Sequence, residues 1–175
     1  FLAANPFGRT TPSGSTLNSQ IVNGLCDPLA GAWMSLTLWR HYQFSADLDY
    51  LKSTAYPVLR GAAWFILDLL VEDNNGNLVI APSGSPEHNY IDPVSGKSLR
   101  MTYGSTYHNE IIKELFSACI EAAEKLNLDD GFRDRLKNTL PKLPRLKIGK
   151  DGTIQEWIKD YKEAEPGHRH ISHLL

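Results

Sequence analysis

The sequence lacks the features that mark several large classes of protein. It has no run of Lys or Arg and a formal net charge of −2, so it offers no basic face of the kind that binds nucleic acid. No apolar run approaches the length of a membrane span. The two cysteines, Cys26 and Cys119, are too few for a disulfide framework. We therefore expect neither a nucleic-acid partner nor a membrane partner.

Several catalytic and cofactor motifs are also missing from the sequence. There is no glycine-rich phosphate loop after a strand, no Gly-x-Ser-x-Gly elbow and no Cys–His pair in a catalytic context. We expect no cofactor. The chain opens on Phe1-Leu2-Ala3-Ala4, without Met or a signal peptide, and stops at His173-Leu174-Leu175 in mid-pattern. We expect a piece of a longer protein.

The residues that are present predict helices joined by long loops. With 175 residues and 42% apolar content, the chain can bury a sizeable core as one domain. Residues 1–26 show no period and predict a loop-rich lead-in, whereas residues 27–175 predict helical hairpins. Residues 78–103 predict an irregular insertion between helices. Strands do not alternate with helices, so the prediction is an all-α fold and not a parallel α/β fold.

Local signals place the helices. Asp27-Pro28 predicts a helix start with Asp27 as its N-cap, and apolar residues around the helix predict burial nearly all round. Ser45 predicts the cap of a short helix, and Asp129 or Asp130 the cap of a later one. The longer helices are expected at about 55–71, from about 106, and at 132–140. A small hairpin is expected at 146–154.

Glu87 is the main candidate for proton transfer. It stands beside His88 in a segment, 82–88, whose two prolines and Gly84 exclude helix and regular strand. Such a loop can hold a carboxylate over a cleft, and partial burial raises the pKa of a carboxyl group towards the range of a general acid. A turn cap or an Arg pair would be the structural alternative for Glu87. For Asp92, in an Asp-Pro turn, we favour the structural role.

A second group of polar residues lies at 168–173, where three histidines surround Arg169. Their spacing fits no strong metal signature, so we expect no metal site there. Hydrogen bonds from Arg169 and His170 to sugar hydroxyls are the alternative, and His173 is expected to pack in the core. Among the tryptophans, Trp39 and Trp64 are expected in the core, while Trp33 and Trp157 are candidates either for stacking on a sugar ring or for packing.

The order of these segments resembles glycoside hydrolase family 95, the α-L-fucosidases and relatives that act on α-L-galactosides. The resemblance covers nearly all of residues 28–175. It rests on these stretches: Gly31-Ala32-Trp33, Leu38-Trp39-Arg40-His41-Tyr42, residues 55–63, Ala81-Pro82-Ser83, Ser85-Pro86-Glu87, Glu114-Leu115-Phe116, Ile148-Gly149, Gln155-Glu156-Trp157 and residues 167–174.

The resemblance implies that residues 1–175 form part of a single (α/α)6 toroid of the six-hairpin glycosidase type. It implies an inverting exo-hydrolase that removes terminal α-L-fucose, α-1,2-linked, or α-L-galactose, with Glu87 as the general acid. The residues expected to contact the sugar are Trp33, His88, Glu156, Trp157, Arg169 and His170. The carbohydrate is the expected partner, and the family relation implies an extracellular or periplasmic location.

Some positions depart from the family pattern. The Asp that activates water in the family should lie beyond Leu175, and the upstream Asn motif is missing around Asn5. We therefore expect this fragment alone to be inactive. His108 stands where an acidic residue is expected. Two alternatives remain: a non-catalytic sugar-binding protein on the same scaffold, and a helical array that binds other proteins.

Overall fold

We describe residues 27–86 and 88–167 from a computed structural model of the chain. These residues form two compact units. The first unit holds residues 27–28, 80–86, 88–108 and 145–167, and the second holds residues 29–79 and 109–144. Glu87, Arg169 and His170 lie outside the described residues, as do the loop-rich lead-in and Cys26.

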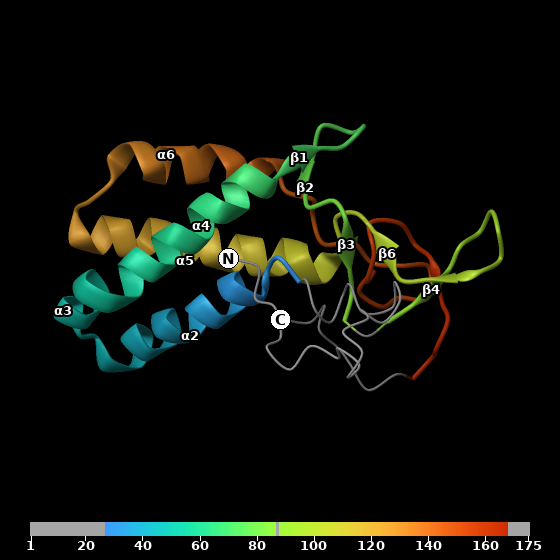
Figure 1. The fold of residues 1–175 in the computed structure, drawn as a ribbon, viewed down its shortest axis with the longest axis horizontal. Coiled ribbons are helices and arrows are strands. Elements are labelled where there is room, and N and C mark those ends of the chain that lie inside the picture. Colours follow the sequence, from blue (N-terminus) through green and yellow to red (C-terminus); the bar gives the residue numbers. More distant parts are fainter. Residues whose placement is uncertain (1–26, 87, 168–175) are drawn as a thin grey trace, which may run out of the picture. The chain divides into compact units, whose positions relative to one another are not determined.

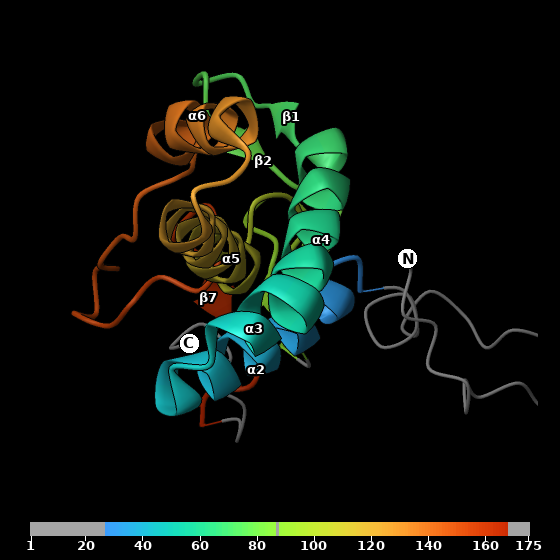
Figure 2. The same cartoon turned by 90° about the vertical axis from the view of Figure 1, so that its left-hand side faces the viewer.

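The second unit carries most of the helical residues. Figures 1 and 2 show α5 (Thr106–Leu126), which starts in the first unit, running between α2 and α6. Helix α2 packs on α4 and on the π-helical turn η2. The other elements are α2 (Ala30–Ser45), α3 (Leu48–Tyr50), η2 (Leu51–Ala55), α4 (Tyr56–Leu69), α6 (Asp130–Thr139) and the 3-10 turn η3 (Leu140–Lys142).

Helical periodicity builds the core of this unit, as predicted for α4 and α5. Apolar side chains three and four positions apart lie on one face of a helix and are removed from water together. Cys119 is buried on that face of α5, which confirms its prediction as a small buried residue. Trp39 is buried and Trp64 stacks on Phe132, so both pack as expected. The most buried side chains of the unit include Leu36, Leu51, Leu59, Ile66, Ile112, Leu115 and Phe116.

Helix α2 differs from its prediction in two ways. Its N-cap is Leu29, with no side-chain cap, because the carboxylate of Asp27 bonds elsewhere. The expectation of burial nearly all round is also wrong, since Met34 is 68% exposed and Phe44 is 94% exposed. One face of α2 packs on its neighbours, and the opposite face keeps apolar side chains in water.

Two other predicted caps are replaced by different contacts. Asp47, not Ser45, caps α3, because its carboxylate accepts the backbone N–H of Tyr50 at 2.9 Å. Asp129 stands at the N-cap of α6 in a left-handed conformation, with φ 54°, but makes no capping bond. Its carboxylate accepts instead from the hydroxyl of Tyr56 and from Nε of Arg60, both at 2.8 Å. At Asp129, side chains far away in the sequence therefore take the place of the backbone N–H groups of its own helix.

The turn at 74–77 forms as predicted and joins β1 (Val71–Glu72) to β2 (Leu78–Val79) in an antiparallel pair. Asp73 organises this turn. Its carboxylate accepts from the backbone N–H groups of Asn75 and Asn77 at 2.8 and 2.9 Å. Desolvation by itself would raise the pKa of Asp73, but these hydrogen bonds outweigh it and hold the pKa below its usual value.

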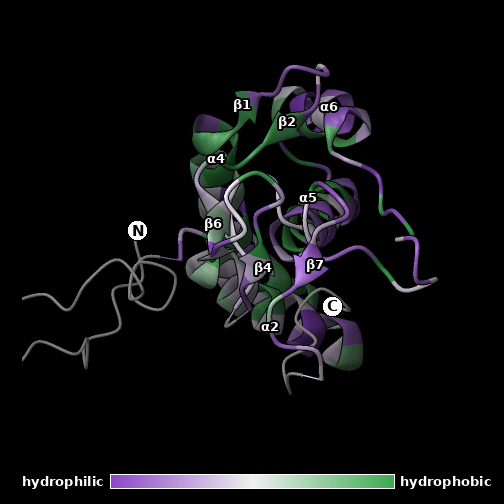
Figure 3. Ribbon diagram, turned by 90° about the vertical axis from the view of Figure 1, so that its right-hand side faces the viewer, coloured by the Kyte–Doolittle hydropathy of each residue, from purple (hydrophilic) through white to green (hydrophobic). Residues whose placement is uncertain are grey.

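The first unit contains short antiparallel strands. Strand β3 (Ser83–Gly84) pairs with β6 (Met101–Thr102), and β4 (Tyr90–Ile91) lies between β5 (Ser98–Leu99) and β7 (Lys162–Glu163). Figure 3 shows β7 in the colour of hydrophilic residues.

The segment after Pro82 includes the two residues of β3, although the sequence analysis excluded a regular strand there. Residues 78–103 also hold β2, β4, β5 and β6, so this insertion contains more strand than expected, and its other described residues are irregular or turn.

Two predicted turns in this unit are confirmed. Asp92 begins the turn at 92–97, where its carboxylate accepts from the N–H and hydroxyl of Ser95, so its structural role is confirmed. The predicted hairpin at 146–154 forms around one bridge between Ile148 and Ile154. Gly152 there has φ 84°, a conformation that glycine adopts without strain.

Helices predominate over strands among the described residues. Each described strand has two residues, and no described sheet closes on itself. This agrees with the helical class at a coarse level, while the (α/α)6 toroid stays a prediction. Within the same ranges, no helix has the length and apolar character needed to span a membrane.

Candidate functional site

The interior of the first unit is unusually polar. Polar side chains are buried there beside a smaller number of apolar and aromatic ones, and buried polar groups require partners. All belong to segments that flank position 87 in the sequence or are bonded to those segments. The buried polar residues of this unit are Ser83, Ser85, His88, Ser105, Thr106, His108 and Glu156.

His88 and Glu156 form a buried pair. Nδ1 of His88 lies 2.6 Å from a carboxylate oxygen of Glu156. A carboxylate only accepts hydrogen bonds, so Nδ1 carries the proton, and this contact fixes the imidazole tautomer. The backbone N–H of His88 also donates to the carbonyl of Ser85 at 2.9 Å. The described neighbours of position 87 are thus fixed on both sides.

Aromatic rings pack around this pair. Tyr90 stacks on Tyr161 with ring centroids 4.3 Å apart, and Trp157 lies 5.6 Å from Tyr90 and 6.4 Å from His88. Trp157 is buried, and within the described part of the chain its Nε1 has no hydrogen-bond partner. The buried hydroxyl of Ser85 likewise has no hydrogen-bond partner among the described residues. Burial, the largest cause, raises the pKa of Tyr90.

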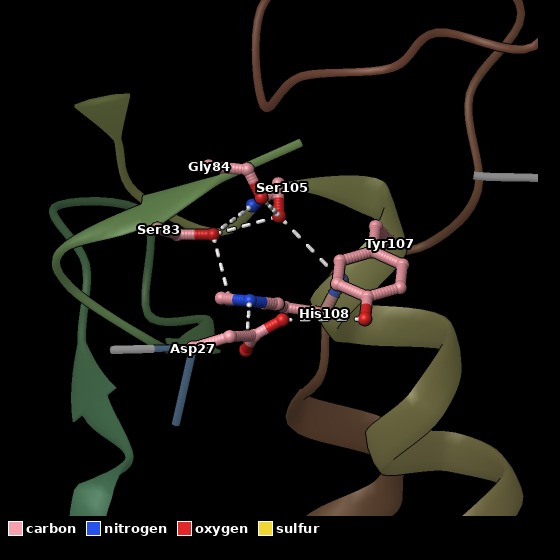
Figure 4. Close-up of polar contacts among 6 residues, drawn as sticks. All are labelled: Asp27, Ser83, Gly84, Ser105, Tyr107 and His108. Atoms are coloured by element: carbon pink, nitrogen blue, oxygen red, sulfur yellow. Dashed lines mark hydrogen bonds and ion pairs between the residues drawn. The ribbon is translucent and has the colours of Figure 1, made fainter. Parts of the chain in front are cut away.

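A second polar cluster joins the start of α5 to β3 (Figure 4). His108 has oxygen partners on both ring nitrogens: Nδ1 lies 2.9 Å from Oγ of Ser83, and Nε2 lies 3.2 Å from Oδ1 of Asp27. Oγ of Ser83 is also 2.7 Å from Oγ of Ser105 and accepts the Ser105 N–H at 3.0 Å. The hydroxyl of Ser105 donates to the Gly84 carbonyl at 3.0 Å.

Asp27 has a further partner in Tyr107, whose hydroxyl donates to Oδ2 at 3.2 Å. Burial raises the pKa of Tyr107, and the negative charge of Asp27 and this hydrogen bond add to the effect. The hydroxyl therefore remains a donor. The Asp27 carboxylate accepts from two consecutive residues of α5 and ties itself to the first turn of that helix.

The cluster contains Ser, His and Asp, the residue types of a nucleophilic triad, but its geometry excludes that chemistry. Ser83 is 1% exposed and its oxygen already serves Ser105 and His108, so no substrate carbonyl can reach it. The cluster is a structural network of hydrogen bonds.

A cleft of about 380 Å³ lies in the first unit along residues 149–166. Glu156 and Trp157 contribute to its wall, together with the charged side chains of Lys150 and Asp160. The size falls within the range of small-molecule sites. Among the described residues, no group of three or more His, Cys, Asp or Glu side chains could hold a metal ion.

The sequence model of the glycosyl hydrolase family 95 catalytic domain matches residues 2–175. The chain belongs to glycosyl hydrolase family 95. It is 40% identical over 149 residues to "Alpha-L-fucosidase 2" of Arabidopsis thaliana, covering 85% of this chain and 18% of that protein. It is 35% identical over 167 residues to "Probable alpha-fucosidase A" of Aspergillus niger, covering 92% of this chain and 20% of that protein. The chain thus spans about a fifth of the length of these relatives.

The structure brings some predicted site residues of this family 95 chain together. His88, Glu156 and Trp157 meet in the first unit, where all three are buried. Trp33 lies in the first turn of α2 in the second unit and is 44% exposed. The roles of these residues in sugar binding, and those of Glu87, Arg169 and His170, stay predictions.

Sequence reasoning missed the second cluster of this family 95 chain. Asp27 was predicted as a helix cap, Ser83 entered only as part of the family stretch Ala81-Pro82-Ser83, and Ser105 carried no motif. The one available signal was His108, which stands where the family pattern leads us to expect an acidic residue. That departure marked the position but gave no indication of its partners, which lie 25 and 81 residues away.

Proposed function

We propose that the full-length parent is an inverting exo-glycosidase that removes terminal α-L-fucose, α-1,2-linked, or α-L-galactose from oligosaccharides or glycans. The observation that carries the proposal is the family 95 match over residues 2–175, with two relatives named as fucosidases. A buried polar interior around the segment of Glu87 supports it, because such interiors are more typical of functional sites than of simple cores.

In the proposed reaction, Glu87 donates a proton to the glycosidic oxygen as the C–O bond breaks. Water attacks the anomeric carbon from the opposite face and gives its proton to an Asp outside this chain. The two carboxyl groups of an inverting enzyme stand roughly 6.5–9.5 Å apart, which leaves room for that water. The transition state resembles an oxocarbenium ion, so polar groups around the ring stabilise it.

The His88–Glu156 pair has a defined place in this proposal. Glu156 holds the imidazole of His88 in one tautomer and one orientation, next to the acid in the sequence. Trp157 packs against both His88 and Tyr90 and limits the movement of that imidazole. Trp33, Arg169 and His170 complete the proposed set of sugar contacts, and the parent is proposed to fold as an (α/α)6 toroid.

Hydrolysis assays with the full-length parent test the proposal. We expect release of fucose from a 2′-fucosylated oligosaccharide, or of sugar from p-nitrophenyl α-L-fucoside or p-nitrophenyl α-L-galactoside, and a loss of roughly 10²–10⁴-fold with the oligosaccharide in Glu87→Gln. Proton NMR of freshly released fucose should show the β-anomer first. Unchanged turnover in Glu87→Gln would contradict the assignment of the acid.

Two further outcomes separate the alternatives. Sugar binding without release from any substrate would favour the non-catalytic sugar-binding protein. The proposed extracellular or periplasmic location is tested by expressing the parent with its native N-terminus and assaying the cell fractions. Recovery only from the cytosol would contradict it.

A further inference from the structure

The hydrogen-bond network of Asp27, His108, Ser83 and Ser105 is not used by the proposed reaction, yet its four side chains are joined in one continuous series of contacts (Figure 4). It lies where the chain leaves β3 towards Glu87. Ser83 precedes Glu87 by four positions, and the intervening Pro86 limits the freedom of the connection. A shift at Ser83 would therefore be passed along the segment.

The orientation of each group in the network depends on the next. Asp27 accepts hydrogen bonds only, so Nε2 of His108 carries a proton towards it. The carbonyl of Gly84 also only accepts, so the hydroxyl of Ser105 points to Gly84. The Ser83 oxygen receives the Ser105 N–H, its hydroxyl donates to Oγ of Ser105, and it lies 2.9 Å from Nδ1 of His108. Asp27 thus holds the imidazole of His108, and the imidazole in turn contacts Ser83.

Water cannot substitute for these contacts. His108 is 3% exposed and Ser105 is fully buried, so a lost partner leaves a desolvated polar group. Backbone contacts lock the same junction, because the Gly104 N–H donates to the Ile80 carbonyl at 2.9 Å and Gly84 pairs with Met101 across β3 and β6. The contacts therefore hold Ser83 in one position, which is what positioning a neighbouring group requires.

We propose that Asp27 and His108 are positioning residues for the general acid, acting through Ser83 on the segment that carries Glu87. This inference rests on the proposed function, in which Glu87 protonates the leaving oxygen. Neither residue is assigned any contact with the substrate. Their removal should weaken proton donation in particular and leave sugar binding intact.

Asp27→Asn in the full-length parent is the sharpest variant. Asp27 accepts from both Tyr107 and His108, whereas the amide of Asn offers one accepting oxygen and one donating nitrogen. Either one contact breaks or the imidazole of His108 turns and its contact with Ser83 changes. His108→Asn is the second variant, since its amide can reach Ser83 in place of Nδ1 but falls short of Asp27. Asp68→Asn and His41→Asn, at exposed helix positions, are the matched controls.

Two substrates separate positioning of the acid from general damage. Departure of a sugar needs protonation, whereas fluoride leaves α-L-fucosyl fluoride with little help from an acid. We expect Asp27→Asn and His108→Asn to lower kcat on a 2′-fucosylated oligosaccharide by roughly 10–100-fold, within the range that general acid catalysis supplies. Fluoride hydrolysis and KM should change less than about threefold, and both controls should match the wild type.

A double variant gives the second readout. If Asp27 acts through Glu87, adding Asp27→Asn to Glu87→Gln should cause no further loss on the oligosaccharide, because residues that act as a unit are non-additive. Equal losses on both substrates, a full additional loss in the double variant, or wild-type rates in both positioning variants would overturn the inference. Failure of both variants to fold, judged by circular dichroism, would also overturn it, because the network would then be structural only.

Failure of the proposed function has a different signature. If Glu87→Gln retained hydrolysis of the oligosaccharide, the acid assignment itself would be wrong. Suppose instead that Glu87→Gln lost hydrolysis of the oligosaccharide but retained hydrolysis of the fluoride, while Asp27→Asn and His108→Asn hydrolysed both substrates like the wild type. The assignment of Glu87 as the acid would then be supported, and only the positioning role of Asp27 and His108 would be wrong.

Discussion

Nδ1 of His88 lies 2.6 Å from the carboxylate of Glu156, although 68 residues separate them in the chain. Both side chains are buried. A buried donor that loses its acceptor retains the full desolvation penalty, which is larger than the net value of the hydrogen bond. The pair therefore contributes to stability as well as to the proposed sugar site.

Glu156→Ala should lower the free energy of unfolding of the full-length parent by about 1–3 kcal/mol, because it leaves Nδ1 of His88 buried without its acceptor. Glu156→Gln keeps an accepting oxygen and should retain most of that stability. Chemical denaturation of the variants measures the difference. Glu163→Ala, at an exposed position of β7, is the control and should stay within about 0.5 kcal/mol of the wild type. An equal effect of Glu156→Ala and Glu163→Ala would contradict the prediction.

Cys119 should resist alkylation in the folded protein. Burial raises the pKa of its thiol to about 12, and only the thiolate is nucleophilic. At pH 8, iodoacetamide should modify Cys119 on the order of a thousand times more slowly than a thiol of ordinary pKa, with access reduced further. Peptide mapping by mass spectrometry measures the rate at this cysteine, before and after denaturation. Equal rates in both states would contradict burial.

The sign of the associated pH effect follows from the raised pKa of Cys119. The buried thiol is neutral, so its contribution to stability is fully present below the unfolded pKa, near 9. It declines as the pH rises from about 9 towards 12, because the unfolded chain then loses a proton that the folded chain retains. Cys119→Ala should reduce the slope of stability against pH in that window.

Asp129 should tolerate Asn better than Ala or Gly. It combines a left-handed backbone, with φ 54°, with bonds to Tyr56 and Arg60. Asn accepts that conformation and keeps one oxygen, Gly keeps only the conformation, and Ala keeps neither. We expect Asp129→Ala to be the least stable, by about 1 kcal/mol relative to Asp129→Gly. Thermal unfolding ranks the three variants, and Ala equal to Asn would contradict this account.

The proposed toroid predicts that the exposed apolar face of α2 is covered in the full-length parent. Met34→Ser should then destabilise the parent by about 1–3 kcal/mol. Val94→Ser, at a turn position where Val94 is 93% exposed, is the control and should change stability by less than about 0.5 kcal/mol. If Met34→Ser were as neutral as Val94→Ser, this face of α2 would be open in the parent, against the toroid.

Local sequence determined the parts of the fold whose contacts are close in the chain. The apolar period of three and four residues gave α4, α5 and the burial of Cys119, because neighbours on one helix face are fixed by backbone geometry. The turns led by Asp73 and Asp92 were predictable for the same reason, since each carboxylate bonds to backbone N–H groups two to four residues ahead. The family resemblance added the catalytic class.

Only the tertiary structure decided the partners of the polar side chains. Asp27 and Asp129 both have the sequence of a helix cap, yet each bonds to side chains more than 65 residues away. A local cap is worth about 1 kcal/mol, and a carboxylate that can reach two donors in a partly buried site gains more. Which donors come within reach depends on how the loops close, and no local pattern encodes that. The network around His108 therefore became visible only when the chain was folded.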